Sequence, residues 1–287
     1  MTASSTIDLL TALWLGFLGS CVGSFLNVVA YRMPRGMSVI WKPSHCPKCS
    51  HPIRFYDNVP VLGWLWLRGR CRDCGEQISP RYAIVEFFMG LAFFVLAYVE
   101  LFSGGANLPD GPITELSGAT DIVWQPQWEV IGIYAFHCFV LSVLMCLVLM
   151  DRDESFLPKR IGLCLPFCIL FRGAWWLYRP TKPIVQESEY FGLVAVLVVC
   201  LVATFTKAGR VTLHHIYFIF ALSCIGIATQ LTVAITALVL CAALIPVASL
   251  QKIPGSQHLR HFIMPCVWLG GMLQIAFWQQ IANRCSI

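Results

Sequence analysis

Long apolar runs separated by short polar stretches make up most of this chain. Eight runs approach the ~20 residues that an α-helix needs to cross a bilayer. They occupy residues 9–30, 83–102, 130–150, 161–177, 191–206, 216–230, 231–250 and 262–282. Arg172 interrupts the fourth run, and the sixth and seventh almost touch. The pattern therefore predicts an all-α polytopic membrane protein with about eight transmembrane helices.

The first apolar run is expected to stay in the protein as a transmembrane helix. The preceding residues, MTASSTI, contain no Lys or Arg, and no convincing small-residue cleavage site follows the run. A secretory signal peptide would normally show both features. The pattern favours a retained span at 9–30.

Composition agrees with a membrane protein. Hydrophobic residues make up 57% of the chain, charged residues 12%, and the mean hydropathy is +0.71. A soluble domain has about 25% charged residues. The fourteen cysteines do not indicate a secreted disulfide scaffold, because the rest of the sequence resembles bilayer-spanning segments.

The loops differ sharply in charge. Residues 32–81 contain nine basic and three acidic residues, a net charge of +6, whereas residues 103–129 contain four acids and no Lys or Arg. Positively charged loops remain in the cytosol, so the first loop is predicted to be cytosolic and the second external. In the basic loop, Lys and Arg alternate with Trp, Leu and Pro beside apolar runs. We therefore expect this loop to bind anionic lipid and no nucleic acid.

The cytosolic loop contains two close cysteine pairs, Cys46-x2-Cys49 and Cys71-x2-Cys74. Two such pairs supply the four thiolates of a tetrahedral structural zinc site. The 21 residues between the pairs lie just beyond the usual spacing. Chance pairing among fourteen cysteines is the alternative. A zinc-ribbon-like loop is the prediction.

These features divide the chain into four parts. We expect a first transmembrane helix at 1–31, a basic tetracysteine loop at 32–82, a second transmembrane helix with its external loop at 83–128, and the remaining bundle at 129–287.

Several polar or small residues lie within the predicted spans. Small residues in the first span form a face that allows another helix to approach closely: Gly16, Gly19, Ser20, Gly23 and Ser24. Asn27 needs a polar partner at that depth, and Glu86 is expected to have a structural ion pair with Arg81 or Arg32. His137 is expected to form a helix-to-helix hydrogen bond, with a proton relay as the alternative.

Two segments resemble a known family. They are GFLGSCVGSFLNVVAYRMPRG at 16–36 and SHCPKCSHPIRFYDNVPVLGWLWLRGRCRDCGEQISPRYAIVEFFMG at 44–90. Both resemble the N-terminal region of the type IV prepilin leader peptidases, except that Gly63 and Ala83 stand where that family usually has Ser and Pro. The likeness covers about 75 residues and is weaker elsewhere.

The resemblance implies a function and a location. Family members are intramembrane aspartic endopeptidases of the bacterial inner (cytoplasmic) membrane. They cut the leader from type IV prepilin or pseudopilin precursors at the cytosolic face, in type IV pilus or type II secretion systems. The resemblance also implies an N-methyltransferase activity with S-adenosylmethionine as the methyl donor, and it places the peptidase region at 129–287.

Family catalysis uses two aspartates that share a proton, and this chain contains the first. In the run MDRDESFLPK at 150–159, Asp151 matches the first catalytic aspartate and Asp153 the next acid of the motif. Glu154 lies three residues after Asp151 and is a neighbour on a helix, so Asp153 and Glu154 are candidate auxiliary acids. Lys159 departs from the family pattern. The alternative is an acidic helix cap neutralised by nearby basic residues.

The second aspartate is not found. Thr212 and His214 stand in the region where the family motif places it, and no Asp occurs after Asp153. His214 or His215 could serve as a general base with Asp151, with a hydrogen-bonded packing role as the alternative. The sequence leaves three hypotheses: a working prepilin peptidase, a catalytically inactive member (a pseudoenzyme) that binds pilin-like or assembly proteins, and methyl transfer alone.

Overall fold

The computed structural model describes residues 3–41, 43–107 and 113–153, together with 265, 268–273 and 275–276. The chain divides into two compact units, one formed by Met1–Ser142 with Ala276–Ile287 and the other by Val143–Ile275. In the described residues the ordered elements are helical and no extended strand occurs. The structure therefore agrees with a mainly helical protein.

Three helices are long and apolar enough to cross a membrane: Ser5–Arg32, Arg81–Leu101 and Trp128–Arg152. They correspond to α1 (Ala3–Arg32), to α3 (Arg81–Leu96) with its π-helical continuation η2 (Ala97–Leu101), and to α5 (Trp128–Arg152). The spans predicted at 9–30, 83–102 and 130–150 are confirmed as membrane-length helices.

The other predicted spans lie wholly or largely outside the described residues. Those at 161–177, 191–206, 216–230 and 231–250 are not described. Within the last, 262–282, the described residues 268–273 and 275–276 are helical. The count of eight spans stays a prediction.

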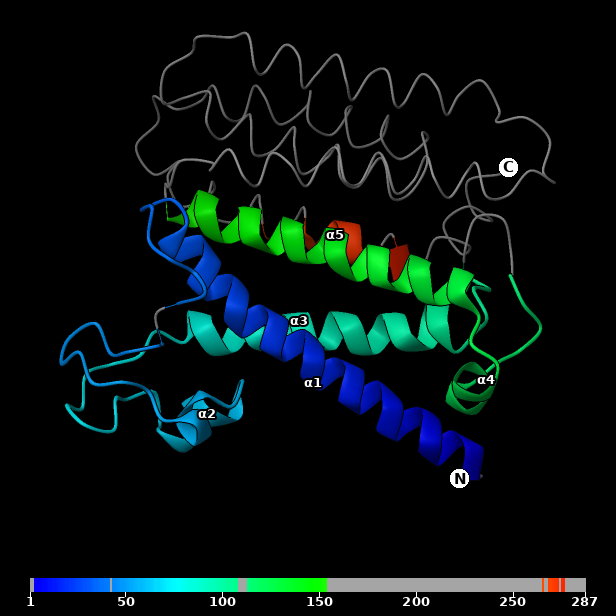
Figure 1. Ribbon diagram of the computed structural model, residues 1–287, viewed down its shortest axis with the longest axis horizontal. Coiled ribbons are helices and arrows are strands. Elements are labelled where there is room, and N and C mark those ends of the chain that lie inside the picture. The colour runs from blue at the N-terminus through cyan, green and yellow to red at the C-terminus, as the bar shows by residue number, and fades with distance from the viewer. Residues whose placement is uncertain are drawn as a thin grey trace, which may run out of the picture. The chain divides into compact units, whose positions relative to one another are not determined.

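Helices α1 and α3 pack against each other in opposite directions (Figure 1). Small residues of α1 meet α3 in reverse order along the chain, as an antiparallel pair requires. A Cβ added at Gly16 would lie 3.2 Å from the Gly90 carbonyl oxygen, and one added at Gly19 would lie 2.7 Å from the Met89 carbonyl oxygen. A Cβ added at Gly23 would lie 3.0 Å from the Glu86 Cα. The small-residue face predicted for the first span is therefore a helix-packing surface.

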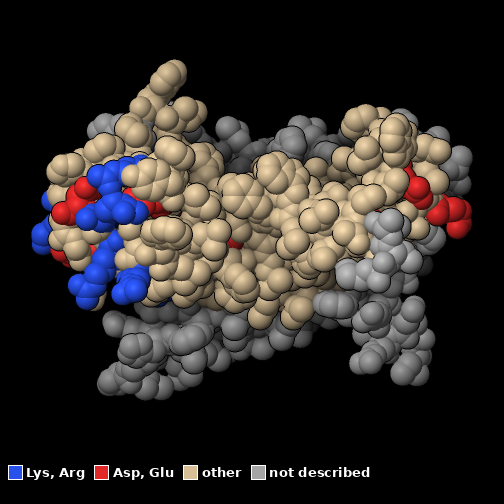
Figure 2. All heavy atoms as spheres, turned by 90° about the horizontal axis from the view of Figure 1, so that it is seen from below, with Lys and Arg blue, Asp and Glu red and all other residues tan. Residues whose placement is uncertain are grey.

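Antiparallel packing brings the end of α1 and the start of α3 together, with the tetracysteine loop between them. At the other end of the pair, the Asp8 carboxylate of α1 accepts a 2.7 Å hydrogen bond from the backbone N–H of Ala119. Ala119 is the first residue of the short helix α4 (Ala119–Trp124). Figure 2 shows the Lys and Arg side chains gathered, with acidic ones among them, at one end of the visible face, acidic side chains alone at the other, and a largely uncharged surface between.

A buried polar pair joins η2 to α5. His137 Nδ1 and Glu100 Oε1 lie 2.7 Å apart, and their side chains are 8% and 1% exposed. The helix-to-helix hydrogen bond predicted for His137 is therefore confirmed, with Glu100 as the partner. The second carboxylate oxygen, Oε2 of Glu100, has no hydrogen-bond partner in the part of the chain that the structure describes.

Candidate metal centre and membrane-edge acids

Each cysteine pair sits on a tight turn with the same hydrogen bonds. The Ser50 N–H donates to the Cys46 carbonyl at 2.9 Å, and the Gly75 N–H donates to the Cys71 carbonyl at 2.9 Å. Ser50 and Gly75 both have positive φ, 59° and 72°. Gly adopts this conformation readily and Ser does so at a cost. The two turns are copies of one local fold, which brings two sulfurs together in each.

The four cysteine sulfurs form one compact cluster. All four Sγ atoms lie within 4.8 Å of one another, with 3.8 Å between Cys46 and Cys74 and 4.0 Å between Cys49 and Cys71. Tetrahedral zinc with Zn–S bonds of ~2.3 Å would place its ligand sulfurs about 3.8 Å apart. The cluster therefore fits a metal ion such as zinc. Four protein ligands leave no open position, which is typical of a structural site.

Local hydrogen bonds prepare one of these thiols as a ligand. Backbone N–H groups of Cys49 and then Lys48 lower the pKa of Cys46 to about 6. The thiolate is the form that binds metal. Burial and the neighbouring thiols raise the pKa of Cys49 and Cys74, so in the absence of a metal ion the cluster favours the thiolate at Cys46 first.

Three ion pairs brace the cysteine turns. The guanidinium of Arg72 donates two hydrogen bonds to Asp57, at 2.7 and 2.5 Å, and holds the pKa of that carboxyl below its usual range. The other two pairs are more open: Arg54 with Asp73 at 3.2 Å and Lys48 with Glu76 at 3.6 Å. Exposed pairs contribute little stability, so the two-bond Arg72–Asp57 pair is the main brace.

The loop is tied to α3 through a γ-turn at Val61. Val61 has φ 62° and ψ −54°, and the Leu62 N–H donates to the Pro60 carbonyl at 2.6 Å. This turn is rare and strained, more so for a β-branched residue. The Val61 N–H donates to Glu86 Oε2 of α3 at 2.7 Å. This hydrogen bond gives Glu86 the structural role predicted for it, and its ion pair with Arg81 or Arg32 stays a prediction.

The γ-turn leads into a short helix, α2 (Leu62–Trp66), which packs on the 3₁₀ turn η1 (Phe55–Asn58). Gly63 allows this contact, because a Cβ there would overlap the Asp57 carbonyl. The Trp64 Nε1–H donates to the Ile78 carbonyl at 2.9 Å. Residues 55–78 therefore form one hydrogen-bonded body that includes the second cysteine turn.

Asn27, the intramembrane amide of α1, is 2% exposed. Its Nδ2 donates to the Gly23 carbonyl one turn earlier at 3.2 Å. Its Oδ1 has no hydrogen-bond partner within the described ranges. The predicted partner is thus a backbone group of the same helix.

The membrane-edge acids lie at the end of α5. Asp151 is in the last turn and is 5% exposed, whereas Asp153 follows the helix and is half-buried. Glu154, Thr212 and His214 lie outside the described residues. The catalytic assignments therefore stay predictions.

Two structural features were missed from the sequence. Ser50 matches Gly75 when the cysteine turns CPKCS and CRDCG are aligned, so this internal repeat would have revealed its positive φ. No local signal shows that Val61 contacts Glu86, because the two residues are 25 positions apart.

One group of comparisons with known proteins matches the N-terminal region that contains the tetracysteine loop. The family "Bacterial Peptidase A24 N-terminal domain" matches residues 17–100. The prepilin leader peptidase/N-methyltransferase of Myxococcus xanthus is 53% identical over 85 residues, which are 30% of this chain and 25% of that protein. No solved structure matches the chain.

Longer alignments extend beyond the loop. The protein of the same name from Klebsiella pneumoniae is 31% identical over 219 residues, covering 73% of this chain and 76% of its own length. That from Vibrio cholerae is 33% identical over 192 residues, covering 64% and 63%. The alignments with curated relatives thus span from a quarter to three quarters of those relatives' lengths. Similarity on this scale, together with the tetracysteine cluster between two membrane-length helices, shows that the chain belongs to the prepilin leader peptidase family.

Proposed function

We propose that this protein processes type IV prepilin or pseudopilin precursors by removing their leader peptides at the cytosolic face of the bacterial inner membrane. The observation that supports this most directly is the similarity to the Klebsiella pneumoniae prepilin leader peptidase/N-methyltransferase over 73% of the chain. That similarity extends well past the tetracysteine loop. The names of its relatives also support methylation of the new N-terminus, with S-adenosylmethionine as donor.

In this proposal Asp151 supplies the first catalytic carboxylate. Its burial at the end of a membrane-length helix suits a group that must hold a proton away from bulk water. Asp153 and Glu154 are auxiliary acids. The partner group comes from the region of Thr212 and His214, and His214 is the candidate general base because no Asp follows Asp153.

The proposal includes a topology. The loop at 32–82 faces the cytosol, the loop after the second helix faces outside, and 129–287 forms the rest of an eight-span bundle. The confinement of Lys and Arg side chains to one end of the visible face supports this orientation (Figure 2). Zinc is the proposed metal of the cysteine cluster, since four thiolates in a reducing cytosol favour it.

A second candidate is a catalytically inactive member that binds precursors or assembly proteins. The missing second aspartate is the observation in its favour. The names of the relatives favour processing.

The test is cleavage of a co-expressed type IV prepilin. We expect the wild-type protein to produce mature pilin with a methylated N-terminus, identified by mass spectrometry, and Asp151→Asn to produce none. Glu129→Gln, at the opposite end of the same helix, is the matched control and should process normally. Equal amounts of uncut precursor with wild type and Asp151→Asn would refute the peptidase and favour the inactive member.

A further inference from the structure

Helix α2 presents apolar side chains to its surroundings. Leu62, Leu65 and Trp66 are 62%, 57% and 81% exposed. Their spacing of three and four residues places them on one side of the helix. We call these three residues the α2 apolar face. Exposed apolar clusters of this kind usually mark a contact with a membrane or another molecule.

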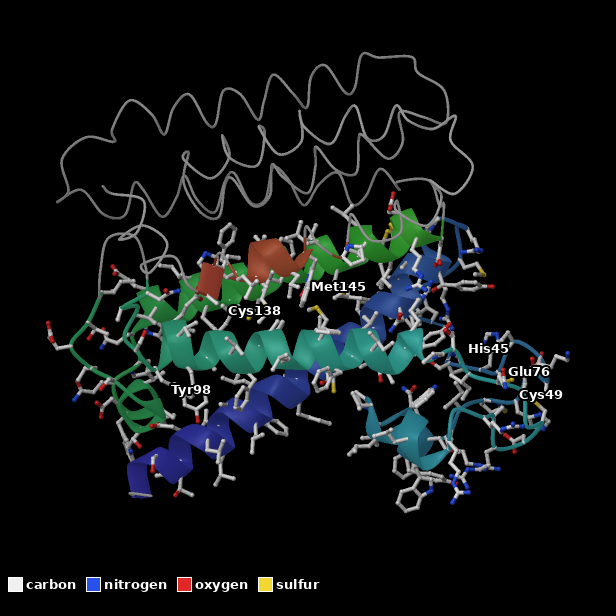
Figure 3. The ribbon with its side chains drawn as sticks, turned by 180° about the vertical axis from the view of Figure 1, so that it is seen from behind. His45, Cys49, Glu76, Tyr98, Cys138 and Met145 are labelled. Carbon is white, nitrogen blue, oxygen red and sulfur yellow. The ribbon has the colours of Figure 1, made fainter. Side chains whose placement is uncertain are left out.

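The position of α2 is fixed relative to a membrane-length helix. Its first turn is held by the Val61 N–H, which donates to Glu86 at 2.7 Å. Glu86 is five residues into α3, which corresponds to about 7.5 Å along the helix axis. Helix α2 therefore lies beside the first turns of a membrane-length helix. Figure 3 shows α2 alongside the start of α3, with Cys49 and Glu76 farther out.

The orientation of α2 is fixed as well. Trp64 points into the loop, where its indole N–H donates to the Ile78 carbonyl. Gly63 is buried against the Asp57 carbonyl. Because Gly63 and Trp64 contact the rest of the loop, the α2 apolar face lies on the side of the helix that points away from the loop.

Charge favours lipid as the occupant. Arg68 and Arg70 follow α2 directly, and both are exposed. Basic side chains next to Trp and Leu suit the boundary between anionic headgroups and acyl chains. The face also lies beside a span whose own exposed apolar residues, such as Ile84 and Phe87, require lipid.

We infer that α2 is an in-plane membrane anchor that inserts Leu62, Leu65 and Trp66 into the bilayer interface and seats the tetracysteine loop on the membrane surface. This role does not depend on the proposed peptidase activity. It requires only that α1 and α3 span the bilayer.

The test is site-specific photocrosslinking in the full-length protein. A genetically encoded benzophenone amino acid replaces Trp66 or, in a second variant, Leu65, and the protein is reconstituted in vesicles of phosphatidylethanolamine and phosphatidylglycerol. The same group at Leu13, which is 54% exposed on α1, is the positive control. Glu76, beside the cysteine turn, is the matched loop position that should remain in water.

We expect phospholipid adducts at positions 65 and 66, with yields at least about tenfold above that at position 76, as an interfacial helix requires. If benzophenone at position 13 forms lipid adducts and benzophenone at positions 65 and 66 forms none, the anchor is overturned. Adducts to a co-expressed prepilin or to a second copy of this chain, in place of lipid, would overturn it too and identify a protein-docking surface.

Discussion

The tetracysteine loop and the α1–α3 helix pair are held together by opposite means. The loop relies on specific groups: four clustered cysteine sulfurs, an ion pair with two hydrogen bonds, and a carboxylate that accepts from a strained turn. The helix pair relies on glycines, because Gly16, Gly19 and Gly23 have no side chain and let the two backbones approach closely. In lipid, apolar side chains gain nothing by leaving the solvent, so close packing replaces hydrophobic burial. In the loop, too few of the described apolar residues are buried to form a core, so hydrogen bonds, ion pairs and the cysteine cluster take that role.

Metal removal is the largest expected effect and should separate the two regions. Cys46→Ser with Cys71→Ser should abolish metal binding and unfold residues 43–80, since structural zinc supplies ~10 kcal/mol or more to small domains. The measurement is zinc content by mass spectrometry, together with limited proteolysis of the loop. The control is Cys21→Ser in α1, which should leave both unchanged. Unaltered metal content in the double variant would show that the cluster is not the metal site.

Overpacking the helix pair is the next largest effect. Gly19→Ala places a Cβ 2.7 Å from a backbone oxygen of α3, and such strain costs about 1–3 kcal/mol. Gly16→Ala, with its nearest atom at 3.2 Å, should cost less. Thermal unfolding in detergent measures both, and Leu18→Ala on an exposed part of α1 is the control. Zinc content should stay constant, and a loss of zinc in Gly19→Ala would show that the two regions are not independent.

The smallest expected effect on stability comes from substituting Glu86, which joins the loop to the helix pair. Glu86→Gln keeps an acceptor for the Val61 N–H but removes its charge, so the local loss should be about 1 kcal/mol. Hydrogen exchange of residues 59–66 should speed up modestly, and more in Glu86→Ala. Exchange in the second cysteine turn should not change. Equal exchange in all three proteins would mean that Glu86 does not hold the γ-turn.

Sequence reasoning worked where spacing alone decides the structure. The three described spans follow from apolar length, and the cysteine cluster follows from two Cys-x2-Cys turns. The helix-packing face of α1 was also visible from its glycines. Each of these signals lies within a short stretch of chain.

Apart from the turn at Ser50, the missed features are contacts between residues that are distant in the sequence. Glu100 was not recognised as the partner of His137, because the two residues are 37 positions apart. Glu100 also lies on a π-helical turn, which no sequence pattern predicts. The link from Val61 to Glu86 is likewise a product of tertiary packing. Of the candidate catalytic residues, only Asp151 and Asp153 lie in the described part, so the peptidase assignment still depends on resemblance and on the cleavage test.

The order of the four cysteines along the chain has a consequence for biosynthesis. All four thiols precede Arg81, so they leave the ribosome before α3 does. The cysteine cluster can therefore assemble before α3 enters the membrane, with only α1 inserted. Glu86 arrives afterwards and completes the γ-turn at Val61. The loop can then fold before its second membrane attachment exists, so the cysteine cluster assembles ahead of the junction at Glu86.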